Sequence, residues 1–375
     1  MIAVLFGTFN AKHAANALLE SDLRRAGVEV RSCHEPLWEE TRDKHASYFA
    51  PFALVRLALR WVASMVRLSL RFGGAARGAD LVVAGFNGQL DVLVARALAR
   101  GRRVLFAPLV TITETLVDDR ERYAPGSFMG RALETVDRSS LRAADVVLVD
   151  TEAHRVYLEE RLSVAPERVV VQYLGAESVF APVPPRASSS GSGTLRVLGY
   201  GSYLPLHGYD VVAEAARLLS PDEGISFDLI GSGPERARTD GVVRDLPNVV
   251  TYDWVPYEEL PERIAAADVV LGIFGASVKA RMVVPNKIYQ SAQVGRAIVT
   301  ADTPAIREVF EPGESIVTIE PSGRALAEAL RVLARDPERR ARIGAAAREA
   351  VQRAAGPEVR AERLALALGL GGEGS

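Results

Sequence analysis

The most constraining part of the sequence runs from Val269 to Phe310, where two strand–helix units follow one another. An apolar strand (VVLGIF) leads through a loop into a helix that opens at Pro-Asn-Lys and stops at Gly295. A second strand (AIVT) follows, and another helix opens at Thr303-Pro304. We therefore expect two helix N-termini side by side at the carboxyl ends of adjacent parallel strands. In open α/β sheets, phosphorylated ligands bind at such places.

A lysine stands at an unfavourable position in the first of these helices. Lys287 lies in the first turn, where a cation opposes the helix macrodipole by about 0.3–1 kcal/mol. A residue that breaks a local rule often serves a function, and the function expected here is to hold an anion. An ordinary surface lysine is the alternative interpretation.

The length and charge of the chain limit its class. At 375 residues the chain is too long for one typical hydrophobic core, so two domains are expected. The formal net charge is −2 and the sequence pI is about 6.3. No basic field therefore indicates a nucleic-acid partner.

The few cysteines and histidines argue against disulfides and metal sites. The single cysteine, Cys33, excludes an intrachain disulfide and fits a reducing compartment. None of the five histidines has the spacing of an HExxH or similar metal site. The N-terminal run MIAVLFGTF has no basic segment before it and is interpreted as a buried strand. These features predict a cytoplasmic protein without a metal.

Short apolar runs alternate with helical patterns along the chain, which predicts parallel sheets covered on both faces. Residues 182–194 (PVPPRASSSGSGT) interrupt this alternation and are typical of a linker. We therefore predict an α/β fold with two doubly wound Rossmann-like domains facing a cleft, formed by residues 1–181 and 195–350. Residues 351–375 are expected to form a C-terminal helix that packs back toward the N-terminal domain, and a tail. The helices expected are 13–26, 49–72, 88–99, 152–162, 209–219, 258–267, 286–294, 304–310, 322–335, 337–355 and 357–368.

The helix expected at 49–72 is unusually apolar. Its arginines fall in one narrow sector, and Leu, Val, Trp, Met and Phe occupy the rest. These arginines are Arg56, Arg60, Arg67 and Arg71. Four cations make a transmembrane span costly. One interpretation is an interfacial helix whose arginines contact anionic headgroups of a membrane. The other is a long helix docked on its own sheet with its arginines in water.

Two further strand ends in the second half carry glycines. The first strand is followed by Gly201 and Ser202, and the second by the turn Gly231-Ser232-Gly233. A single glycine after a strand usually reflects only turn geometry. Together with the helix start at Asn286, however, these strand ends predict backbone amides that approach a diphosphate.

The second half resembles the nucleotide-sugar domain of the family 4 (group 1) glycosyltransferases, which have the two-Rossmann GT-B fold. The resemblance rests on runs that occur in order over residues 195–350: GYGSYLPLHGYDVVAEAARLL, FDLIGSGPE, PNVVTYDWVPYEELPERIAAADVVLGIF, PNKIYQSAQVGRAIVTADTPAIREVF and ARDPERRARIG. The first half resembles the family only through the turn at Gly7, LRAADVVLVDTEA and VVVQYLGAESVFAP.

The resemblance implies a set of donor-binding residues. His207 takes the place of the basic residue that precedes a glycine in the family, and Lys287 with its helix amides would hold the diphosphate. Gln290 replaces the glutamate that typically holds the ribose hydroxyls, and Met282 stands near the family's other glutamate. The backbone around Trp254 and Val255 would meet the base. The donor-binding residues expected are Gly201, Ser202, Gly208, Gly231, Gly233, Val255, Lys279, Asn286, Lys287 and Gln290. His207 as a loop cap and Gln290 as a solvated helix residue are the alternatives.

The first half supplies the other candidates. Gly7, Thr8, Asn10 and His13 lie at the end of the first strand and are expected on the acceptor side. His13 is equally consistent with a helix-start residue. Besides Lys287 and His207, the candidate catalytic residues are Glu114 and Asp118, although such a charge run is also typical of a hydrated loop.

The function expected is that of a retaining glycosyltransferase that moves a sugar from a UDP- or GDP-type donor to an acceptor hydroxyl, without an essential metal or other cofactor. A membrane-bound helix 49–72 would favour a lipid-linked or glycoconjugate acceptor and a peripheral location on the inner face of the membrane. A soluble small-molecule acceptor remains open. A sugar-nucleotide isomerase or epimerase of the same fold and a non-catalytic relative are the alternative functions.

Overall fold

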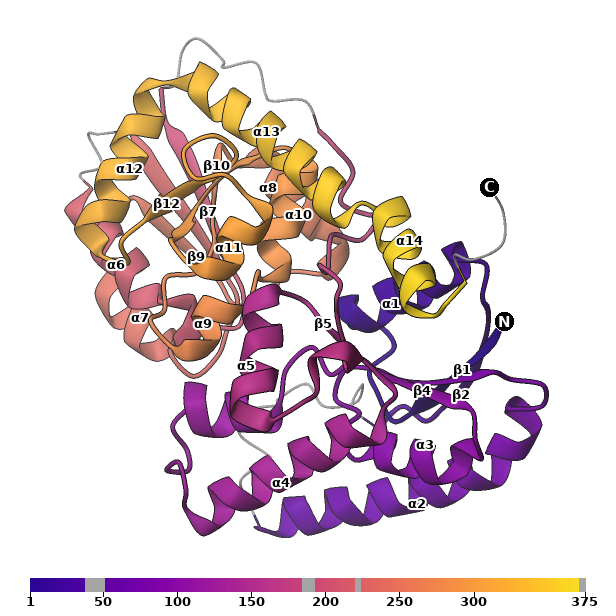
Figure 1. Cartoon of the computed structure of the whole chain (residues 1–375). Coiled ribbons are helices and arrows are strands. Elements are labelled where there is room, and N and C mark those ends of the chain that lie inside the picture. The colour runs from indigo at the N-terminus through magenta and orange to yellow at the C-terminus, as the bar shows by residue number, and fades with distance from the viewer. Residues whose placement is uncertain (38–50, 184–192, 220–223, 371–375) are drawn as a thin grey trace. The chain divides into compact units, whose positions relative to one another are not determined.

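The computed structural model describes residues 1–37, 51–183, 193–219 and 224–370 (Figure 1). They form two compact units. Unit 1 comprises Met1–Leu174 and the chain from Pro357 onward, and unit 2 comprises Gly175–Gly356. Both are α/β units, as the alternation of apolar runs and helical patterns predicts. The cleft expected between them stays a prediction.

Unit 1 is built on one parallel sheet of strand order β2-β1-β3-β4-β5-β6. Its strands are β1 (Ile2–Gly7), β2 (Glu29–His34), β3 (Leu81–Ala84), β4 (Arg103–Phe106), β5 (Val146–Val149) and β6 (Val169–Val171). Its helices are α1 (Ala14–Arg25), α2 (Pro51–Ala75), α3 (Asp91–Ala99), the π-helix η2 (Glu114–Asp119), α4 (Phe128–Ala143), α5 (Glu152–Leu162), the 3₁₀ turn η3 (Pro166–Arg168) and α14 (Pro357–Ala367).

Both faces of this sheet are covered, because successive side chains of a strand point to opposite faces. On β1, Leu5 packs in a core with α1 and α14, through residues such as Leu23 and Leu364. The next residue, Phe6, packs edge to face against Phe72 of α2 with ring centroids 5.6 Å apart. The buried, nearly continuous apolar strands thus follow from the position of the sheet between two helical layers.

Unit 2 repeats the architecture with a parallel sheet of order β12-β11-β10-β7-β8-β9. Its strands are β7 (Leu195–Tyr200), β8 (Ile225–Ile230), β9 (Val249–Tyr252), β10 (Val269–Leu271), β11 (Ala297–Ala301) and β12 (Val317–Ile319). Its helices are α6 (Tyr209–Leu218), α7 (Arg236–Val243), α8 (Leu260–Ala266), α9 (Val278–Met282), α10 (Asn286–Val294), α11 (Pro304–Val309), α12 (Gly323–Arg335) and α13 (Pro337–Ala355), with the 3₁₀ turns η4 (Pro205–His207) and η6 (Tyr257–Glu259).

The border between the units differs from the one expected after residue 181. Residues 175–183 group with unit 2, because Phe180 is fully buried in its core. The amide of Val183 also donates to the carbonyl of Val294, 3.3 Å away. Residues 184–192 of the expected linker lie outside the described residues.

Several helical segments were not expected from the sequence. These are η2, α4, α7 and α9. The helix expected at 49–72 continues to Ala75, and residues 49–50 lie outside the described residues.

The C-terminal helix α14 belongs to unit 1 and lies beside α1, as the yellow and indigo ribbons of Figure 1 show. Arg360 of α14 forms a buried ion pair with Asp22 of α1, with Nε to Oδ2 at 2.9 Å and Nη2 to Oδ1 at 3.0 Å. Both side chains are at most 3% exposed. A second ion pair between the same helices, Arg25–Glu358, is solvent-exposed.

Arg360→Ala is expected to lower the free energy of unfolding by about 3–5 kcal/mol, since it leaves the carboxylate of Asp22 buried without its cation. Arg25→Ala removes an exposed pair between the same two helices and should cost at most about 1 kcal/mol. Urea unfolding of the two variants measures both values. Equal losses would mean that burial of the Asp22–Arg360 pair contributes nothing.

Candidate functional site

The carboxyl ends of β7 and β8 meet in a glycine-lined turn. Gly201 follows β7 with φ of +146°, and Gly231 and Gly233 follow β8 with φ of +125° and +155°. A Cβ on Gly231 would overlap the carbonyl oxygen of Gly201, and one on Gly233 would overlap that of Ser202. Gly231 and Gly233 therefore let the two strand ends touch, and Gly201 keeps the surface above β7 open.

Lys287 lies beside this turn, in the first turn of α10. Its side chain is 7% exposed, and Nζ donates to the carbonyl of Gly272 at 3.2 Å. Nζ also lies 5.8 Å from the ring centroids of Tyr200 and Tyr209. Among the residues that the structure describes, no carboxylate pairs with this amine. Burial lowers the pKa of Lys287 to about 7.

His207 reaches the same place from η4. The backbone around it is fixed to the end of β10, because the amides of Phe274 and Gly275 donate to the carbonyls of His207 and Leu206 at 3.1 and 3.0 Å. Gly208, with φ of +61°, lies so close to the Phe274 backbone that a Cβ would meet its carbonyl carbon at 2.6 Å. His207 Nδ1 is buried and has no hydrogen-bond partner among the described residues.

The two basic groups converge on Gly201. A Cβ built there would lie 2.7 Å from Cε1 of His207 and 3.3 Å from Nζ of Lys287. Burial, with the Lys287 ammonium nearby, lowers the pKa of His207 well below its ordinary value. An uncompensated amine and an unbonded imidazole nitrogen around a bare backbone turn form a cradle for an anion.

Gln290 forms hydrogen bonds with other side chains of unit 2 in this structure. It is 3% exposed, and its Oε1 accepts from the hydroxyl of Tyr200 at 2.9 Å. Its Nε2 donates to the hydroxyl of Tyr257 at 2.9 Å and to Oε2 of Glu177 at 3.3 Å. Gln290 is therefore not the solvated helix residue of the alternative interpretation. Tyr200, Tyr257 and Glu177 were not expected from the sequence.

The other expected donor residues are dispersed around the cradle. Asn286 is the first residue of α10, Ser202 is exposed beside Gly201, and Lys279 is half-buried on α9. Val255 is buried in an apolar cluster, and Met282 is also buried. Only the backbone at Val255 can meet a ligand, while the neighbouring Trp254 is exposed.

In unit 1, the turn after β1 is held by a buried carboxylate. The amide of Thr8 donates to Oδ2 of Asp91 at 2.6 Å, and Trp61 Nε1 donates to Oδ1 at 2.7 Å. A Cβ on Gly7 would meet that carboxylate at 2.5 Å. The turn that contains the acceptor-side candidates Gly7 and Thr8 therefore helps to dock α2 and α3 on the sheet.

Two more acceptor-side candidates stabilise the start of α1. His13 is the N-cap, and its Nδ1 accepts from the amide of Ala15 at 3.3 Å. The side chain of Asn10 accepts from the amide of Lys12 at 3.0 Å. His13 thus has the role of a helix-start residue in this structure.

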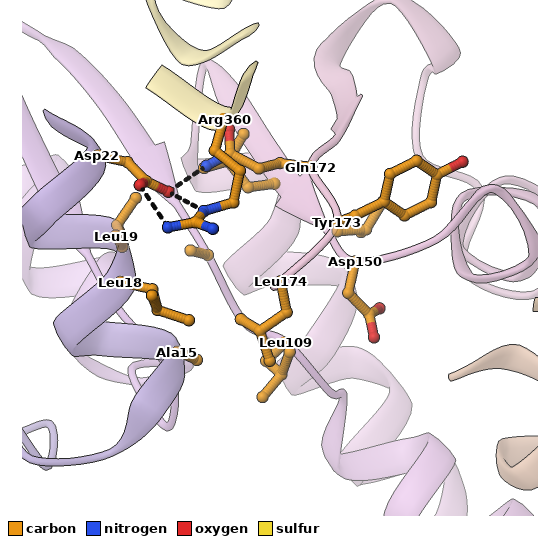
Figure 2. A pocket seen from close by; sticks show the side chains of 13 residues that line it. Ala15, Leu18, Leu19, Asp22, Leu109, Asp150, Gln172, Tyr173, Leu174 and Arg360 are labelled. Atoms are coloured by element: carbon orange, nitrogen blue, oxygen red, sulfur yellow. Dashed lines mark hydrogen bonds and ion pairs between the residues drawn. The ribbon is translucent and has the colours of Figure 1, made fainter. Parts of the chain in front are cut away.

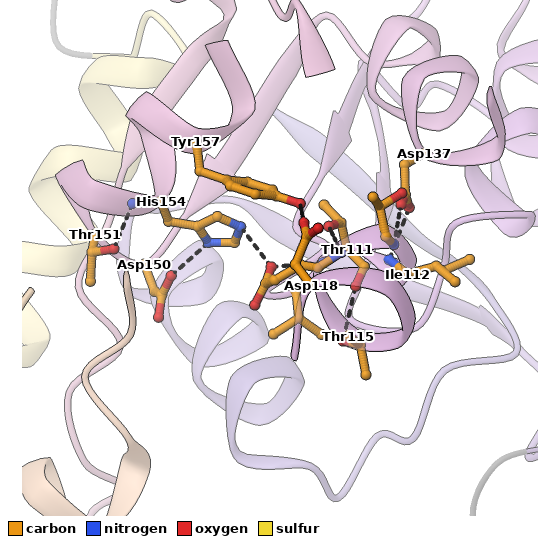
Figure 3. Close-up of polar contacts among 12 residues, drawn as sticks. Thr111, Ile112, Thr115, Asp118, Asp137, Asp150, Thr151, His154 and Tyr157 are labelled. Carbon is orange, nitrogen blue, oxygen red and sulfur yellow. Dashed lines mark hydrogen bonds and ion pairs between the residues drawn. The ribbon is translucent and has the colours of Figure 1, made fainter. Parts of the chain in front are cut away.

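The two candidate catalytic carboxylates lie in η2 and contact α5, and Figure 3 shows Asp118 beside Tyr157. Asp118 Oδ2 accepts from the hydroxyl of Tyr157 at 2.6 Å. Glu114 is fully buried, with Oε2 3.3 Å from Nε2 of His154, and Nδ1 of His154 lies 3.0 Å from Oδ1 of Asp150. Although burial alone would lower it, the two carboxylates raise the pKa of His154 to about 10. Glu114 and Asp118 are not in a hydrated loop, and their contacts anchor η2.

The described residues contain no group of three or more histidine, cysteine, aspartate or glutamate side chains arranged to hold a metal ion. The groups that meet at Gly201 are the amine of Lys287 and the imidazole of His207.

Two family models match the sequence. A model described as "Glycosyl transferase 4-like domain" matches residues 5–175, and one described as "Glycosyl transferase-like" matches residues 210–365. Comparison with curated proteins gives no match.

Solved structures share the fold over the whole chain. Sucrose-phosphate synthase from Thermosynechococcus elongatus has a TM-score of 0.72 at 17% identity and covers 98% of both chains. HepE from Anabaena, solved with UDP, has a TM-score of 0.68 at 15% identity and covers 98% of this chain and 99% of its own. A glycosyltransferase from Rickettsia africae has a TM-score of 0.63 at 12% identity and covers 99% of both. The two six-stranded parallel sheets with flanking helices are thus the GT-B fold.

Glu114→Gln is expected to lower the free energy of unfolding by an amount that depends on pH. The pKa of His154 is raised above its ordinary value, so its ion pairs stabilise the protein fully below about pH 6.5 and are lost as pH rises through about 10. The loss caused by the substitution should be a part of the roughly 5 kcal/mol that this pKa shift represents, because Asp150 contributes to the shift as well, and it should shrink toward pH 10.

Denaturant unfolding from pH 7 to about pH 10 measures this difference. Glu134→Gln is the matched control, since within the described part of the chain Glu134 pairs with Arg138 and Arg161, which do not titrate in this range. A loss at Glu114 that stays constant with pH would contradict a charged His154.

Proposed function

Since the chain belongs to the group 1 (family 4) glycosyltransferases, which use nucleoside-diphosphate sugars, we propose that it moves a hexose-type sugar to an acceptor hydroxyl with retention of anomeric configuration. The donor binds unit 2, with its diphosphate in the cradle of Gly201, His207 and Lys287. No metal takes part in this proposal, because the ammonium and the amides of α10 face the leaving diphosphate.

The observation that carries the proposal is the uncompensated amine of Lys287. A buried ammonium without a counter-charge is costly, and a diphosphate would supply that charge. As the bond between the sugar and the diphosphate breaks, negative charge grows on the leaving oxygen. Donors fixed in advance around that oxygen lower the barrier because they need no reorganisation.

The lowered pKa of Lys287 predicts that donor binding changes the protonation of this amine. Without ligand it is about 7, so the amine is mostly neutral at about pH 8. A bound diphosphate favours the ammonium and raises the pKa. Donor binding at this pH should therefore take up a proton.

We favour UDP as the nucleotide of the donor. HepE, which shares the fold, was solved with UDP and also with UDP-glucose, the latter at a TM-score of 0.67 and 16% identity. The exposed ring of Trp254 follows β9 in unit 2, where the base is expected. GDP serves as the comparison nucleotide.

Calorimetric titration with UDP at about pH 8, in two buffers of different ionisation enthalpy, should show binding with uptake of about one proton. Lys287→Met should weaken UDP binding roughly 10- to 100-fold and abolish the proton uptake, since it removes a charged hydrogen-bond donor. Lys12→Met changes an exposed lysine of unit 1 and serves as the control. If neither UDP nor GDP binds, or if Lys287→Met binds normally, the proposal is wrong.

Helix α2 supports a membrane location. Its described side chains fall into three sectors, one of which is buried against the sheet through Met65, Leu68 and Phe72. A second sector is apolar but exposed, with Leu70 reaching 81% exposure. This apolar stripe consists of Val55, Leu59, Val62, Val66 and Leu70.

The arginines form the third sector and flank the stripe. Arg67 and Arg71 donate to Glu35 at 2.8 and 2.7 Å, so their charges are partly compensated. Arg56 and Arg60 lie nearer the N-terminus of α2 and are exposed. Helix α2 is therefore docked on its own sheet, and its described side chains leave a second apolar face exposed, which is the feature that the membrane interpretation needs.

An exposed apolar stripe bordered by arginines fits the interface of an anionic membrane. No helix within the described ranges has the length and hydropathy to cross a bilayer. We therefore propose that α2 lies on the inner face of the membrane and that the acceptor is lipid-linked or another glycoconjugate precursor.

The chain should float with liposomes that contain phosphatidylserine, and the triple variant Leu59→Ser, Val66→Ser, Leu70→Ser should not, because it removes the apolar stripe. Arg56→Gln with Arg60→Gln should weaken flotation on anionic but not on neutral liposomes. Leu366→Ser, on the exposed face of α14, is the matched control. Flotation that survives the triple variant would contradict the membrane proposal.

A further inference from the structure

We propose that the start of α4 is a second membrane-inserting element of unit 1, and that Phe128 and Met129 enter the apolar boundary of an anionic bilayer together with the apolar stripe of α2. This inference rests on the proposed membrane location of α2 and names a separate point of attachment, which lies 58 positions after the end of that stripe in the sequence.

Two large apolar side chains are exposed next to one another at the start of α4. Phe128 and Met129 are its first two residues and are 85% and 41% exposed. Phe128 is more exposed than any other large apolar side chain that the structure describes. Single exposed apolar side chains are common on soluble proteins, but this pair is held outward by the backbone and lies among cations.

A tight turn holds the pair outward. Ser127 is the N-cap of α4, and its Oγ accepts from the amide of Gly130 at 3.1 Å. The amide of Ser127 donates to the carbonyl of Ala124, also at 3.1 Å. A Cβ on Gly130 would lie 2.8 Å from that carbonyl oxygen, so the inner side of the turn is closed by a glycine. Because the turn is already ordered, insertion of its apolar side chains costs little backbone entropy.

The charges around this turn favour an anionic surface. Residues 120–131 contain three arginines and one glutamate, which gives a net charge of +2. Arg122 and Arg131 are exposed, and Arg120 is half-buried. Anionic headgroups attract such cations, while the apolar side chains between them reach the acyl boundary of the bilayer.

A second copy of the chain would fit this surface less well than a bilayer. A symmetric dimer places the same patch of both copies face to face. The exposed arginines of one copy would then approach those of the other, and like charges in an interface oppose association.

The helices α2, α3 and α4 form one layer. Helix α3 packs against both of the others, and Figure 1 shows the three helices on one side of the sheet and α1 and α14 on the other. Each of the three connects two parallel strands of the sheet. They therefore run in the same direction, with their N-terminal ends at the carboxyl end of the sheet.

Both α2 and α4 extend past the start of α3. Trp61 of α2 donates to Asp91 at the start of α3 at 2.7 Å, and Ser140 of α4 donates to the carbonyl of Gln89 at 2.6 Å. From Ser140, α4 runs back about 18 Å to Phe128. The part of α2 that precedes Trp61 extends in the same direction, so its exposed apolar residues and Phe128 lie at one edge of the layer.

The surface between α2 and α3 is apolar as well. A shallow groove of about 380 Å³ has a wall that includes Trp61, Val66 and Leu70 of α2 and Val94 of α3. Leu90, directly before α3, is 43% exposed. The apolar surface thus continues from α2 across the layer toward α4, as expected of a surface that meets a membrane.

The test measures insertion at single positions of the full chain. Cys33, the only cysteine, is buried, so an introduced surface cysteine can be labelled selectively with the environment-sensitive fluorophore NBD. The labelled variants are Phe128→Cys, Val62→Cys in the apolar stripe of α2, and Leu366→Cys. Liposomes of phosphatidylcholine and phosphatidylserine carry nitroxide-labelled acyl chains. The labels at positions 128 and 62 should shift to the blue and be quenched by the nitroxide, and the label at position 366 should not.

Leu366 is the matched control because it is an exposed leucine of α14, on the other side of the sheet. Figure 2 shows the Asp22–Arg360 ion pair that fixes α14 to α1 there.

Co-sedimentation with the same liposomes, without nitroxide, measures affinity. Phe128→Ser with Met129→Ser should weaken binding roughly tenfold, because it removes apolar surface that would be buried in the bilayer. Arg131→Gln should weaken binding about fivefold on anionic liposomes and leave binding to neutral liposomes unchanged. Leu366→Ser should bind like wild type. A melting temperature and UDP binding for each variant verify that both units are folded.

If the label at position 128 stays in water while the label at position 62 is quenched, the inference is wrong and the membrane location of α2 stands. If neither label is quenched, both proposals are wrong. Light scattering without liposomes identifies the other occupant, since a dimer that Phe128→Ser converts to a monomer would mean that this surface binds a second copy and would overturn the inference.

Discussion

The proposed donor site depends on one electrostatic imbalance, because the amine of Lys287 is removed from water and no carboxylate among the described residues pairs with it. The sheet of unit 2 makes this arrangement possible, because α10 begins at the carboxyl end of β10 and directs the side chain under the turn at Gly201. The tyrosine rings on either side exclude water and offer only weak cation–π contacts. In the proposed reaction, the diphosphate would leave beside this uncompensated amine and would supply the missing negative charge.

Much of the fold follows from the sequence because buried parallel strands must be apolar and their helices begin and end at recognisable residues. Thr303-Pro304 and Gly295 marked the ends of α11 and α10 correctly. Helix α4 escaped notice because only a few of its residues are buried and Gly130 interrupts its pattern. The short α9 and the π-helix η2 have too few turns for any period to emerge.

The site was predictable only where a residue violates a local rule, as Lys287 does. The partners of Gln290 come from Tyr200, Tyr257 and Glu177, which are distant in the sequence and carry no common pattern. His154 and Asp150 are four residues apart, but the charged network that they form also includes Glu114. Helix η2 brings Glu114 to the other side of the imidazole. Such convergences follow from tertiary packing and leave no periodic trace in the sequence.

The return of α14 to unit 1 has a consequence for biosynthesis. Asp22 and Arg360 are 338 positions apart, and the whole of unit 2 is translated between them. On the ribosome, unit 2 is therefore complete before the first unit receives its last helix. Until then the α1 face of the nascent first unit shows leucines and an unpaired carboxylate to the solvent, so this face is the surface of the emerging polypeptide that a chaperone has most reason to shield.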